Sequence, residues 1–358
     1  MSNDKPVRLG VVGLGFMGGV HAQNTESAGH EVVAGVDISP EARDAFADSY
    51  GVNVYADVED MLDAETLDAV AVSTPNAYHE PAVVPALERD IAVFCEKPLA
   101  HELPSAERIV AAATESDAFC MVNFHNRVST AAEVFCGYRD AGMLGEVYHV
   151  EANYIRRRGI PGVGSWFTTA DLSGGGAVVD IGVHAIDFAL YLMGYPDVKD
   201  VFAVTRSDFG TDDEYVDPGD WYEPTDEAVF DVEDAVTATI RCADDRTISL
   251  EVTWAANQPE SNQFVARGTE AGATMPLGGE SITFHQAGKQ GTDHLLDAEL
   301  ADGKIEHTGW EGSDRRFLKA VQAGSPPPLH TAAEALTVQR VIDAIYRSSQ
   351  EGKSVKVE

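Results

Sequence analysis

The feature that most constrains the fold is a glycine string close to the amino terminus. Gly13, Gly15 and Gly18 follow an apolar run at 7–12 and open a helical stretch that continues to about residue 27. The first glycine permits a tight turn, the second lets the backbone approach a phosphate group, and the third lets the helix pack on the strand. This strand–turn–helix unit predicts a parallel, doubly wound sheet at the start of the chain.

The same unit predicts a dinucleotide site. A pyrophosphate rests on the free N–H groups at the amino terminus of a helix, and Asp37, at the end of the next apolar run, is placed to accept from both ribose hydroxyls. The residues expected to bind the dinucleotide here are Gly13, Gly15, Phe16, Met17, Gly18 and Asp37. A carboxylate at this position repels a 2′-phosphate, so NAD is favoured, although Arg43 on the following helix leaves NADP open.

Strand-like and helical segments alternate through the first 126 residues. Strands are expected at 7–12, 32–36, about 54, 69–72, 91–95 and 119–124. Helices are expected up to about 27 and at 40–49, 58–64, 79–89 and 104–115. This order is typical of a parallel α/β sheet with right-handed connections.

From residue 127 onward the pattern changes. Helices are expected at 130–141, 177–193, 311–323 and 331–349, and longer strands at 145–157, 198–206, 229–241, 246–256, 262–268 and 281–286. Such strands predict an open, mostly antiparallel sheet in an α+β domain. We therefore expect two domains, 1–126 and 127–358, with terminal helices that are free to pack back on the first. The acidic, aperiodic segment 208–228 is expected to be a surface loop.

The charge balance excludes several classes of function. The 358 residues hold 59 Asp and Glu against 25 Lys and Arg, which gives a net charge of −34. Such a field repels nucleic acid and anionic membranes, and a dispersed acidic excess is what a high-salt cytoplasm favours. We expect neither a secretory leader nor an apolar run of membrane-spanning length. The prediction is a cytoplasmic protein from a halophilic source.

Two chemistries are not indicated. The cysteines lack any paired spacing, which predicts buried, reduced thiols; they are Cys95, Cys120, Cys136 and Cys242. The histidine and acidic side chains show no compact ligand spacing, so no metal is expected.

Polar clusters follow two strands of the first domain and precede one helix of the second. The carboxyl ends of parallel strands are where doubly wound sheets bind ligands. The three clusters are Ser73-Thr74-Pro75-Asn76 with His79, Glu96-Lys97-Pro98, and Gly174-Gly175-Gly176 followed by Asp180 and His184.

With these motifs, the sequence resembles the glucose-fructose oxidoreductase and inositol dehydrogenase family along essentially its whole length. The resemblance implies a Rossmann domain followed by a sheet domain that shields the nicotinamide and forms the interface of a homo-oligomer, a dimer or tetramer. It implies that Lys97, Asp180 and His184 are catalytic, and that the Lys97–Pro98 bond is cis. The residues that it implies near the cofactor are Ser73, Thr74, Pro75, Asn76, His79, Glu96 and Lys97.

The catalytic set also agrees with the chemistry of alcohol oxidation. This reaction needs a base for the hydroxyl proton and a positive donor to hold the oxygen as charge develops. His184 titrates in the range of such a base. Asp180, one helical turn earlier, is expected on the same face, where it fixes the imidazole tautomer. Lys97 supplies the positive donor.

Plainer interpretations stay open for each group. A histidine and an aspartate on a helix also suit capping or solvated positions, and Lys97 before a proline also suits the end of a strand. Arg156 and Trp166 lie on a loop that we expect to face the substrate, but arginines on a surface loop also pair with the many acids of this chain. Asn123 and Arg127 are expected to line the same cleft.

The sequence therefore predicts an NAD(P)-dependent oxidoreductase whose small-molecule partner is a sugar, sugar derivative or polyol. One alternative is a redox-neutral enzyme that keeps NAD tightly bound, either a sugar–sugar oxidoreductase or a glycoside-cleaving enzyme. Another is a non-catalytic NAD-binding sensor. The intact set of Lys97, Asp180 and His184 argues against a sensor, because a sensor needs no base and cationic donor together.

Overall fold

The computed structural model describes residues 5–212, 215, 229–288, 291–298, 306–327 and 330–357. Contacts within the chain separate two compact units, and the chain passes between them after residues 124, 309 and 336. The first unit therefore combines the amino-terminal part with a segment from near the carboxyl end. The acidic loop expected at 208–228 lies outside the described residues, except for 208–212 and 215.

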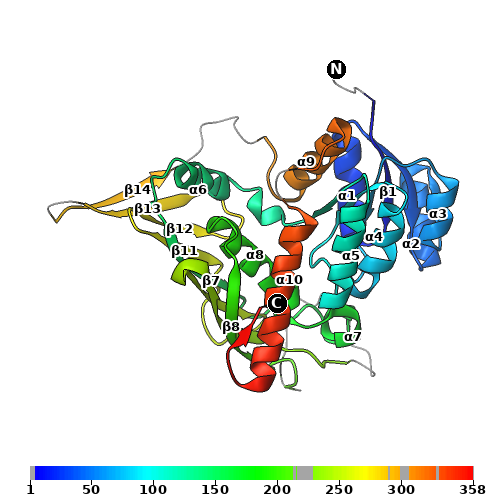
Figure 1. Cartoon of the computed structure of the whole chain (residues 1–358). Coiled ribbons are helices and arrows are strands. Elements are labelled where there is room, and N and C mark those ends of the chain that lie inside the picture. The colour runs from blue at the N-terminus through cyan, green and yellow to red at the C-terminus, as the bar shows by residue number, and fades with distance from the viewer. Residues whose placement is uncertain are drawn as a thin grey trace. The chain divides into compact units, whose positions relative to one another are not determined.

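The first unit is built on a parallel sheet of six strands in the order β3-β2-β1-β4-β5-β6. This order is that of the dinucleotide-binding doubly wound fold, so the predicted fold class is confirmed. The strands are β1 (Arg8–Val12), β2 (Glu31–Val36), β3 (Asn53–Tyr55), β4 (Ala69–Val72), β5 (Ala92–Cys95) and β6 (Cys120–Val122). The helices are α1 (Phe16–Ser27), α2 (Pro40–Tyr50), α3 (Val58–Ala64), α4 (His79–Leu87), α5 (Leu103–Glu115) and α9 (Gly309–Ala323). Figure 1 shows α1 to α5 in blue to cyan around these strands.

Local signals in the sequence set the helix boundaries. The side chain of Ser39 accepts a hydrogen bond from the backbone N–H of Ala42 at the start of α2, and Pro40 occupies the first helical position. Gly51 ends the helix in the left-handed conformation, with φ of 67°. A polar cap, an early proline and a final glycine are the signals that begin and end helices.

Helix α9 completes the core of the first unit although it lies far along the chain. Its Phe317 and Leu318 are buried with Leu9, Val11 and Phe94 of the parallel sheet. The rings of Phe94 and Phe317 stack with centroids 5.0 Å apart. The core of this unit therefore needs residues from both ends of the sequence.

The second unit is built on a sheet of nine strands in the order β14-β13-β12-β11-β7-β10-β9-β8-β15. Every described pairing except that of β7 with β10 is antiparallel, which confirms the predicted open, mostly antiparallel sheet. The strands are β7 (Val147–Ile155), β8 (Val198–Arg206), β9 (Ala235–Cys242), β10 (Thr247–Thr253), β11 (Gln263–Gly268), β12 (Gly272–Pro276), β13 (Ile282–Ala287), β14 (Asp293–Ala298) and β15 (Val355–Lys356). Three of them, β12, β14 and β15, were not predicted.

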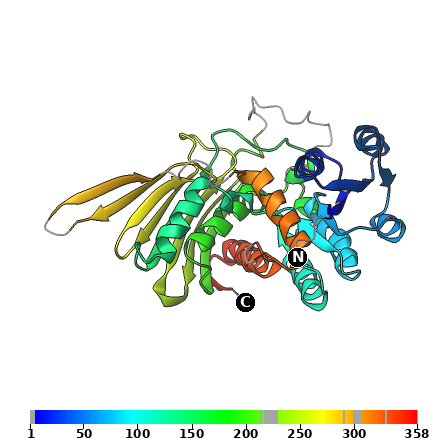
Figure 2. The same cartoon turned by 90° about the horizontal axis from the view of Figure 1, so that it is seen from above.

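Helices cover one face of this sheet, as Figure 2 shows for the green and yellow strands. The helices of this unit are α6 (Thr130–Asp140), α7 (Ala170–Ser173), α8 (Val183–Leu192) and α10 (Ala332–Glu351). The hydroxyl groups of Ser348 and Ser349 on α10 accept hydrogen bonds from the backbone N–H groups of Ala203 and Thr205 on β8. The helix is thus fixed to the sheet by polar contacts as well as by packing.

One helical stretch among the described residues, Ala170–Leu192, is long and apolar enough to cross a membrane, with a mean hydropathy of 1.4 over 18 residues. This corrects the expectation that no apolar run reaches that length. Within the protein, 94% of that window is buried. A helix that is apolar on all sides is either a core helix or a membrane span, and this burial is that of a core helix.

Candidate active site

The three glycines of the amino-terminal string have the three geometries that a dinucleotide turn requires. Gly13 has φ of 88°, and a Cβ there would lie 2.8 Å from the backbone of Ser73. A Cβ on Gly18 would lie 2.0 Å from the carbonyl oxygen of Gly13, so helix α1 packs against the turn. Gly15, the N-cap of α1, has no atom within 4 Å of its Cβ position and no side-chain cap. The open helix terminus at Gly15 fits a pyrophosphate.

Asp37 closes this turn at the end of β2. Its Oδ2 accepts a hydrogen bond from the backbone N–H of Leu14 at 2.8 Å, and its Oδ1 accepts from the N–H of Ser39 at 2.8 Å. Arg43 donates from Nη1 to the carbonyl oxygen of Asp37 at 2.7 Å and to that of Ile38 at 3.1 Å. A carboxylate and a guanidinium therefore lie at the same strand end, where a ribose binds in this fold.

The turn after β4 is joined to the glycine string and to the turn after β5. The Ser73 hydroxyl donates to the carbonyl oxygen of Gly13 at 2.9 Å. His79 is fully buried, and its ring nitrogens lie 3.0 Å from the carbonyl oxygen of Thr74 and 2.9 Å from that of Pro98. Burial lowers the pKa of His79. This histidine joins the two turns through its ring.

One buried polar atom of this turn is available to a ligand. The hydroxyl oxygen of Thr74 is buried and has no hydrogen-bond partner among the described residues. A buried hydroxyl without a partner is costly unless a ligand or water satisfies it. Thr74 is one of the residues expected near the cofactor. The adjoining Pro75 and Asn76 begin the short helical turn that leads to His79, and Asn76 is buried.

Glu96 and Lys97 directly follow β5, and the bond from Lys97 to Pro98 is cis. Glu96 is 9% exposed. Its Oε1 accepts from the side-chain amide of Asn123 at 2.7 Å, and its Oε2 accepts from the backbone N–H of Lys97 at 3.2 Å. The amide oxygen of Asn123 is buried and has no partner among the described residues. Two expected site residues, Glu96 and Asn123, are thus in direct contact.

The glycine triplet of the second unit is held by a carboxylate that sequence reasoning missed. Glu233 accepts hydrogen bonds from the backbone N–H groups of Gly176 at 3.0 Å and Val178 at 2.9 Å, and from the hydroxyl of Tyr346 at 3.0 Å. A Cβ on Gly175 would lie 1.9 Å from the Tyr346 hydroxyl oxygen. Burial raises the pKa of Glu233. The glycines are required because Glu233 and Tyr346 occupy the space beside them.

The helix after the triplet begins as a π turn, Val178–Gly182, before α8. This differs from the predicted uninterrupted α-helix, and π turns are frequent at functional sites. Asp180 lies in the π turn, where its Oδ2 accepts from the indole N–H of Trp254 at 3.0 Å and lies 3.8 Å from Nη1 of Arg156. His184 is 7% exposed, and its ring meets that of His125 edge-on, with centroids 4.9 Å apart.

The remaining expected residues of the second unit differ in their surroundings. Trp166 stacks on Phe167, with ring centroids 3.8 Å apart. Arg127 is fully buried, and its Nε donates to Oδ2 of Asp187 at 2.9 Å. Its Nη2 also donates to the hydroxyl oxygen of Tyr195. The Arg127 side chain is therefore part of the folded interior of this unit.

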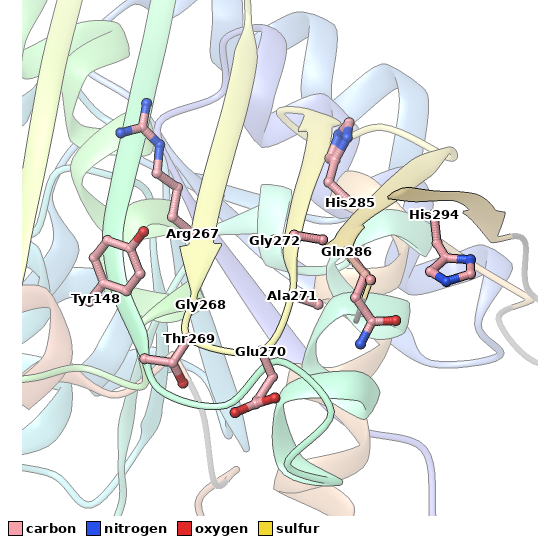
Figure 3. A pocket seen from close by; sticks show the side chains of 12 residues that line it. Tyr148, Arg267, Gly268, Thr269, Glu270, Ala271, Gly272, His285, Gln286 and His294 are labelled. Atoms are coloured by element: carbon pink, nitrogen blue, oxygen red, sulfur yellow. The ribbon is translucent and has the colours of Figure 1, made fainter. Parts of the chain in front are cut away.

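A pocket of about 540 Å³ on the nine-stranded sheet lies apart from all these residues. Figure 3 shows its lining, which comes from β7, β11, β12, β13 and β14 and from the turn between β11 and β12. Tyr148, Arg267, Glu270, His285 and His294 are among the lining side chains, and none of the expected site residues is. We assign no part of the reaction to this pocket.

The comparisons with known proteins agree with the fold and with the motifs. Residues 7–124 match the model of an oxidoreductase family with an NAD-binding Rossmann fold, and residues 138–274 match the GFO/IDH/MocA C-terminal domain. The chain is 32% identical to D-glucoside 3-dehydrogenase of Escherichia coli K12, over 98% of each chain. The chain belongs to the GFO/IDH/MocA oxidoreductase family. It is thus an NAD(P)-dependent oxidoreductase, as predicted.

Other family members extend this comparison. D-xylose 1-dehydrogenase (NADP(+)) 2 of Haloferax volcanii is 27% identical over 98% of each chain. The solved structure of a levoglucosan dehydrogenase in complex with NADH superposes with a TM-score of 0.85 at 23% identity, covering 99% of this chain and 100% of that one. The structural match shows the shared fold.

Sequence reasoning missed several residues that support the expected site of this family member. They are His21, which contacts Glu96, Asp314, which contacts His21, Glu233 and Tyr346 beside the glycine triplet, and Trp254, which donates to Asp180. His21 had a weak signal, because it lies one helical turn after Gly18 in α1. The other four carry no local motif.

Proposed function

We propose that this protein oxidises a secondary hydroxyl group of a sugar, sugar derivative or polyol with NAD. The observation that carries the proposal is the similarity to D-glucoside 3-dehydrogenase, which extends over both units. It therefore includes Lys97 in the first unit and Asp180 and His184 in the second. A pyranoside with a free secondary hydroxyl is the substrate class that we place first.

His184 acts as the base that removes the hydroxyl proton. Asp180 stabilises the protonated imidazole, and the Trp254 indole N–H holds the Asp180 carboxylate in place at 3.0 Å. Lys97 donates a hydrogen bond to the substrate oxygen as negative charge develops on it. When bound, the nicotinamide supplies the carbon that accepts the hydride. The proton leaves with His184 and the electron pair leaves with the hydride, so the alcohol becomes a carbonyl group.

The cofactor is held by the residues of the first unit. The Gly13, Gly15 and Gly18 turn takes the pyrophosphate, with Phe16 and Met17 opening α1 beside it, and Asp37 takes the adenosine ribose. Toward the nicotinamide, the proposed residues are Ser73, Thr74, Pro75, Asn76, His79, Glu96 and Lys97. The unpartnered hydroxyl of Thr74 supports this assignment.

The substrate side of the proposal uses groups suited to hydroxyl-rich ligands. Arg156 is half-buried beside Asp180. Trp166, in the segment between β7 and α7, offers an aromatic face. Asn123 offers its unpartnered amide oxygen as an acceptor. Arg127 is assigned to the same side, and its side chain is fully buried in an ion pair with Asp187.

The decisive experiment compares Lys97→Ala and His184→Ala with the wild type on a substrate panel of methyl glucosides, levoglucosan, xylose and inositols, with NAD and NADP in parallel. We expect NADH formation by the wild type and a loss of at least about 100-fold in kcat for both variants. Wild-type turnover by either variant would contradict the mechanism. Cofactor that stays bound through gel filtration, without net NADH formation, would instead identify the redox-neutral alternative.

We also propose that the uncovered face of the nine-stranded sheet joins copies of this chain. Phe202 and Val204 on β8 are 48% and 43% exposed, and they alternate with the buried Val201 and Ala203. Apolar side chains on an open sheet face favour association. Light scattering should give a dimer or tetramer, and Phe202→Lys should lower the mass; a monomeric wild type would contradict this part.

A further inference from the structure

A buried row of three ionisable side chains lies beneath the Glu96-Lys97 turn of the first unit. His21 on α1 stands between Asp314 on α9 and Glu96 at the end of β5. Its Nδ1 is 2.7 Å from Oδ1 of Asp314, and its Nε2 is 3.2 Å from Oε1 of Glu96. His21 is 1% exposed and Asp314 is 3% exposed. The row joins three elements that are far apart in the sequence.

Both ring nitrogens of His21 face a carboxylate oxygen. Only the doubly protonated imidazole can donate to two carboxylates at once, so the geometry favours a cation at this position. Burial alone would lower the pKa of His21, but the charge and hydrogen bond of Asp314, with those of Glu96, raise it to about 10. Burial alone would raise the pKa of Glu96, but the hydrogen bond and charge of His21 lower it to about 2. The contacts of His21 therefore favour the ionised form of Glu96.

The other groups that face this row fix its orientation. The side-chain amide of Asn24 donates to Oδ2 of Asp314 at 2.6 Å, and the ring of Phe94 meets that of His21 edge-on at 5.2 Å. Asn123 donates to Glu96 from the β6 side. The charge of the neighbouring Lys97 also lowers the pKa of Glu96. Burial lowers the pKa of the nearby His79, and the charge of Glu96 offsets part of that lowering.

The end of the row that reaches the edge of the sheet is a carboxylate next to Lys97. The carboxyl ends of the strands are where doubly wound sheets bind their ligand, and Glu96 and Asn123 directly follow the neighbouring strands β5 and β6. Oxidised nicotinamide carries a positive charge that the reduced ring lacks. A fixed negative charge at this edge therefore favours the oxidised form over the reduced one.

We propose that His21 and Asp314 are positioning residues of this enzyme, which hold Glu96 ionised and in one orientation so that the site binds oxidised nicotinamide in preference to reduced nicotinamide. The inference rests on the proposed function for the place of the nicotinamide. It does not depend on the roles of Lys97 and His184 in the chemical step, and it is tested by binding alone.

The test measures the dissociation constants of NAD⁺ and NADH for the full-length protein between pH 5 and 8, by calorimetry and by NADH fluorescence. In the wild type the ratio of the two constants should be independent of pH. Glu96→Gln should raise the ratio, Kd(NAD⁺)/Kd(NADH), about threefold to tenfold at every pH. In His21→Gln, the carboxylates of Glu96 and Asp314 lose the cation between them, so one of them should bind a proton as the pH falls. The ratio should therefore rise toward the Glu96→Gln value at low pH.

A matched control is His30→Gln, a histidine of the same unit that accepts a hydrogen bond from the backbone N–H of Val7; it should keep the wild-type ratio. Histidine NMR of the cofactor-free protein gives an independent measurement, in which His21 should stay protonated to about pH 9 and should titrate at lower pH in Asp314→Asn. The proposal would be overturned if Glu96→Gln and His21→Gln lowered the melting temperature but left the ratio of dissociation constants unchanged. The three side chains would then have a structural role only. A shifted ratio together with full turnover by Lys97→Ala would refute the proposed mechanism and retain this inference.

Discussion

The backbone of Gly176 lies directly against Glu233, and a Cβ at position 176 would be 1.8 Å from the Glu233 carbonyl oxygen. The same glutamate binds the N–H groups of Gly176 and Val178 through its side chain. Both the backbone and the side chain of Glu233 thus contact the start of the π turn that contains Asp180. Any side chain at position 176 must displace this contact.

We expect Gly176→Ala to lower the unfolding free energy by about 1–3 kcal/mol through overpacking, and to reduce turnover because Asp180 moves with the displaced turn. Thermal melts and steady-state kinetics would measure both effects. The control is Gly137→Ala in α6, where a Cβ meets nothing within 4 Å, and which should stabilise the protein by about 0.5–1 kcal/mol. Wild-type melting and turnover for Gly176→Ala would show that the contact is not required.

Gly15 and Gly18 should respond differently to the same substitution. Gly15→Ala places its methyl group in open space, so the melting temperature without cofactor should stay near that of the wild type. The affinity for NADH should fall at least about tenfold, because the methyl group occupies the space proposed for the pyrophosphate. Gly18→Ala meets the Gly13 carbonyl oxygen at 2.0 Å, so it should lose both stability and binding. Unchanged NADH affinity in Gly15→Ala would place the pyrophosphate elsewhere.

The choice between NAD and NADP should depend on one charge. Asp37→Asn keeps an oxygen that can accept from the backbone but removes the repulsion of a 2′-phosphate, and Arg43 already lies at this strand end. We expect the ratio of kcat/KM for NADP to that for NAD to rise at least about tenfold. Adding Arg43→Ala should reverse most of the gain. A wild type that prefers NADP more than tenfold would show that Asp37 does not set the preference.

The ion pair of Arg127 and Asp187 should be worth more to the fold than to the reaction. Arg127→Met leaves a buried carboxylate without its guanidinium, which should cost about 3–5 kcal/mol in denaturant unfolding. The double variant Arg127→Met/Asp187→Leu should recover at least half of that loss, because it removes both charges. If Arg127 also binds substrate, KM should stay raised in the double variant; a single variant as stable as the wild type would refute the structural role.

The net charge of −34 predicts a protein that needs salt. Counterions screen the repulsion among the acidic side chains, so the melting temperature and the activity should both fall when molar salt is replaced by dilute buffer. A scan over sodium and potassium chloride concentrations would measure this. Full activity and an unchanged melting temperature in dilute buffer would count against a halophilic source.

The fold could be predicted largely because its signals are local. Alternating apolar segments placed the strands and helices of the first unit to within a few residues, and caps such as Ser39 set their ends. Strand β14 was not predicted because its residues are nearly all exposed, and such a strand lacks the alternation of buried and exposed positions on which the prediction depends. Strand β12 begins with Gly272 and ends with Pro276, residues that are typical of turns.

The candidate site divides in the same way between local and distant signals. Glycine strings and the residues at strand ends were visible as motifs, whereas the partners that orient them were not. Asp314 contacts His21 across 293 positions of sequence, and no spacing rule connects two such residues. The π turn was missed because the spacing of Asp180 and His184 was interpreted with the α-helical period, and an inserted π turn leaves no separate mark in the sequence.

The place of α9 in the first unit has a consequence for how the protein is made. A ribosome releases the parallel strands early, but Phe317, Leu318 and Asp314 emerge only near the end of translation. Until then the growing chain carries an unfinished apolar surface around Phe94 and a histidine without its second carboxylate. A gene truncated after the sixth strand would encode that unfinished form permanently, so an expression fragment of the cofactor-binding half needs the segment 310–336 joined to it.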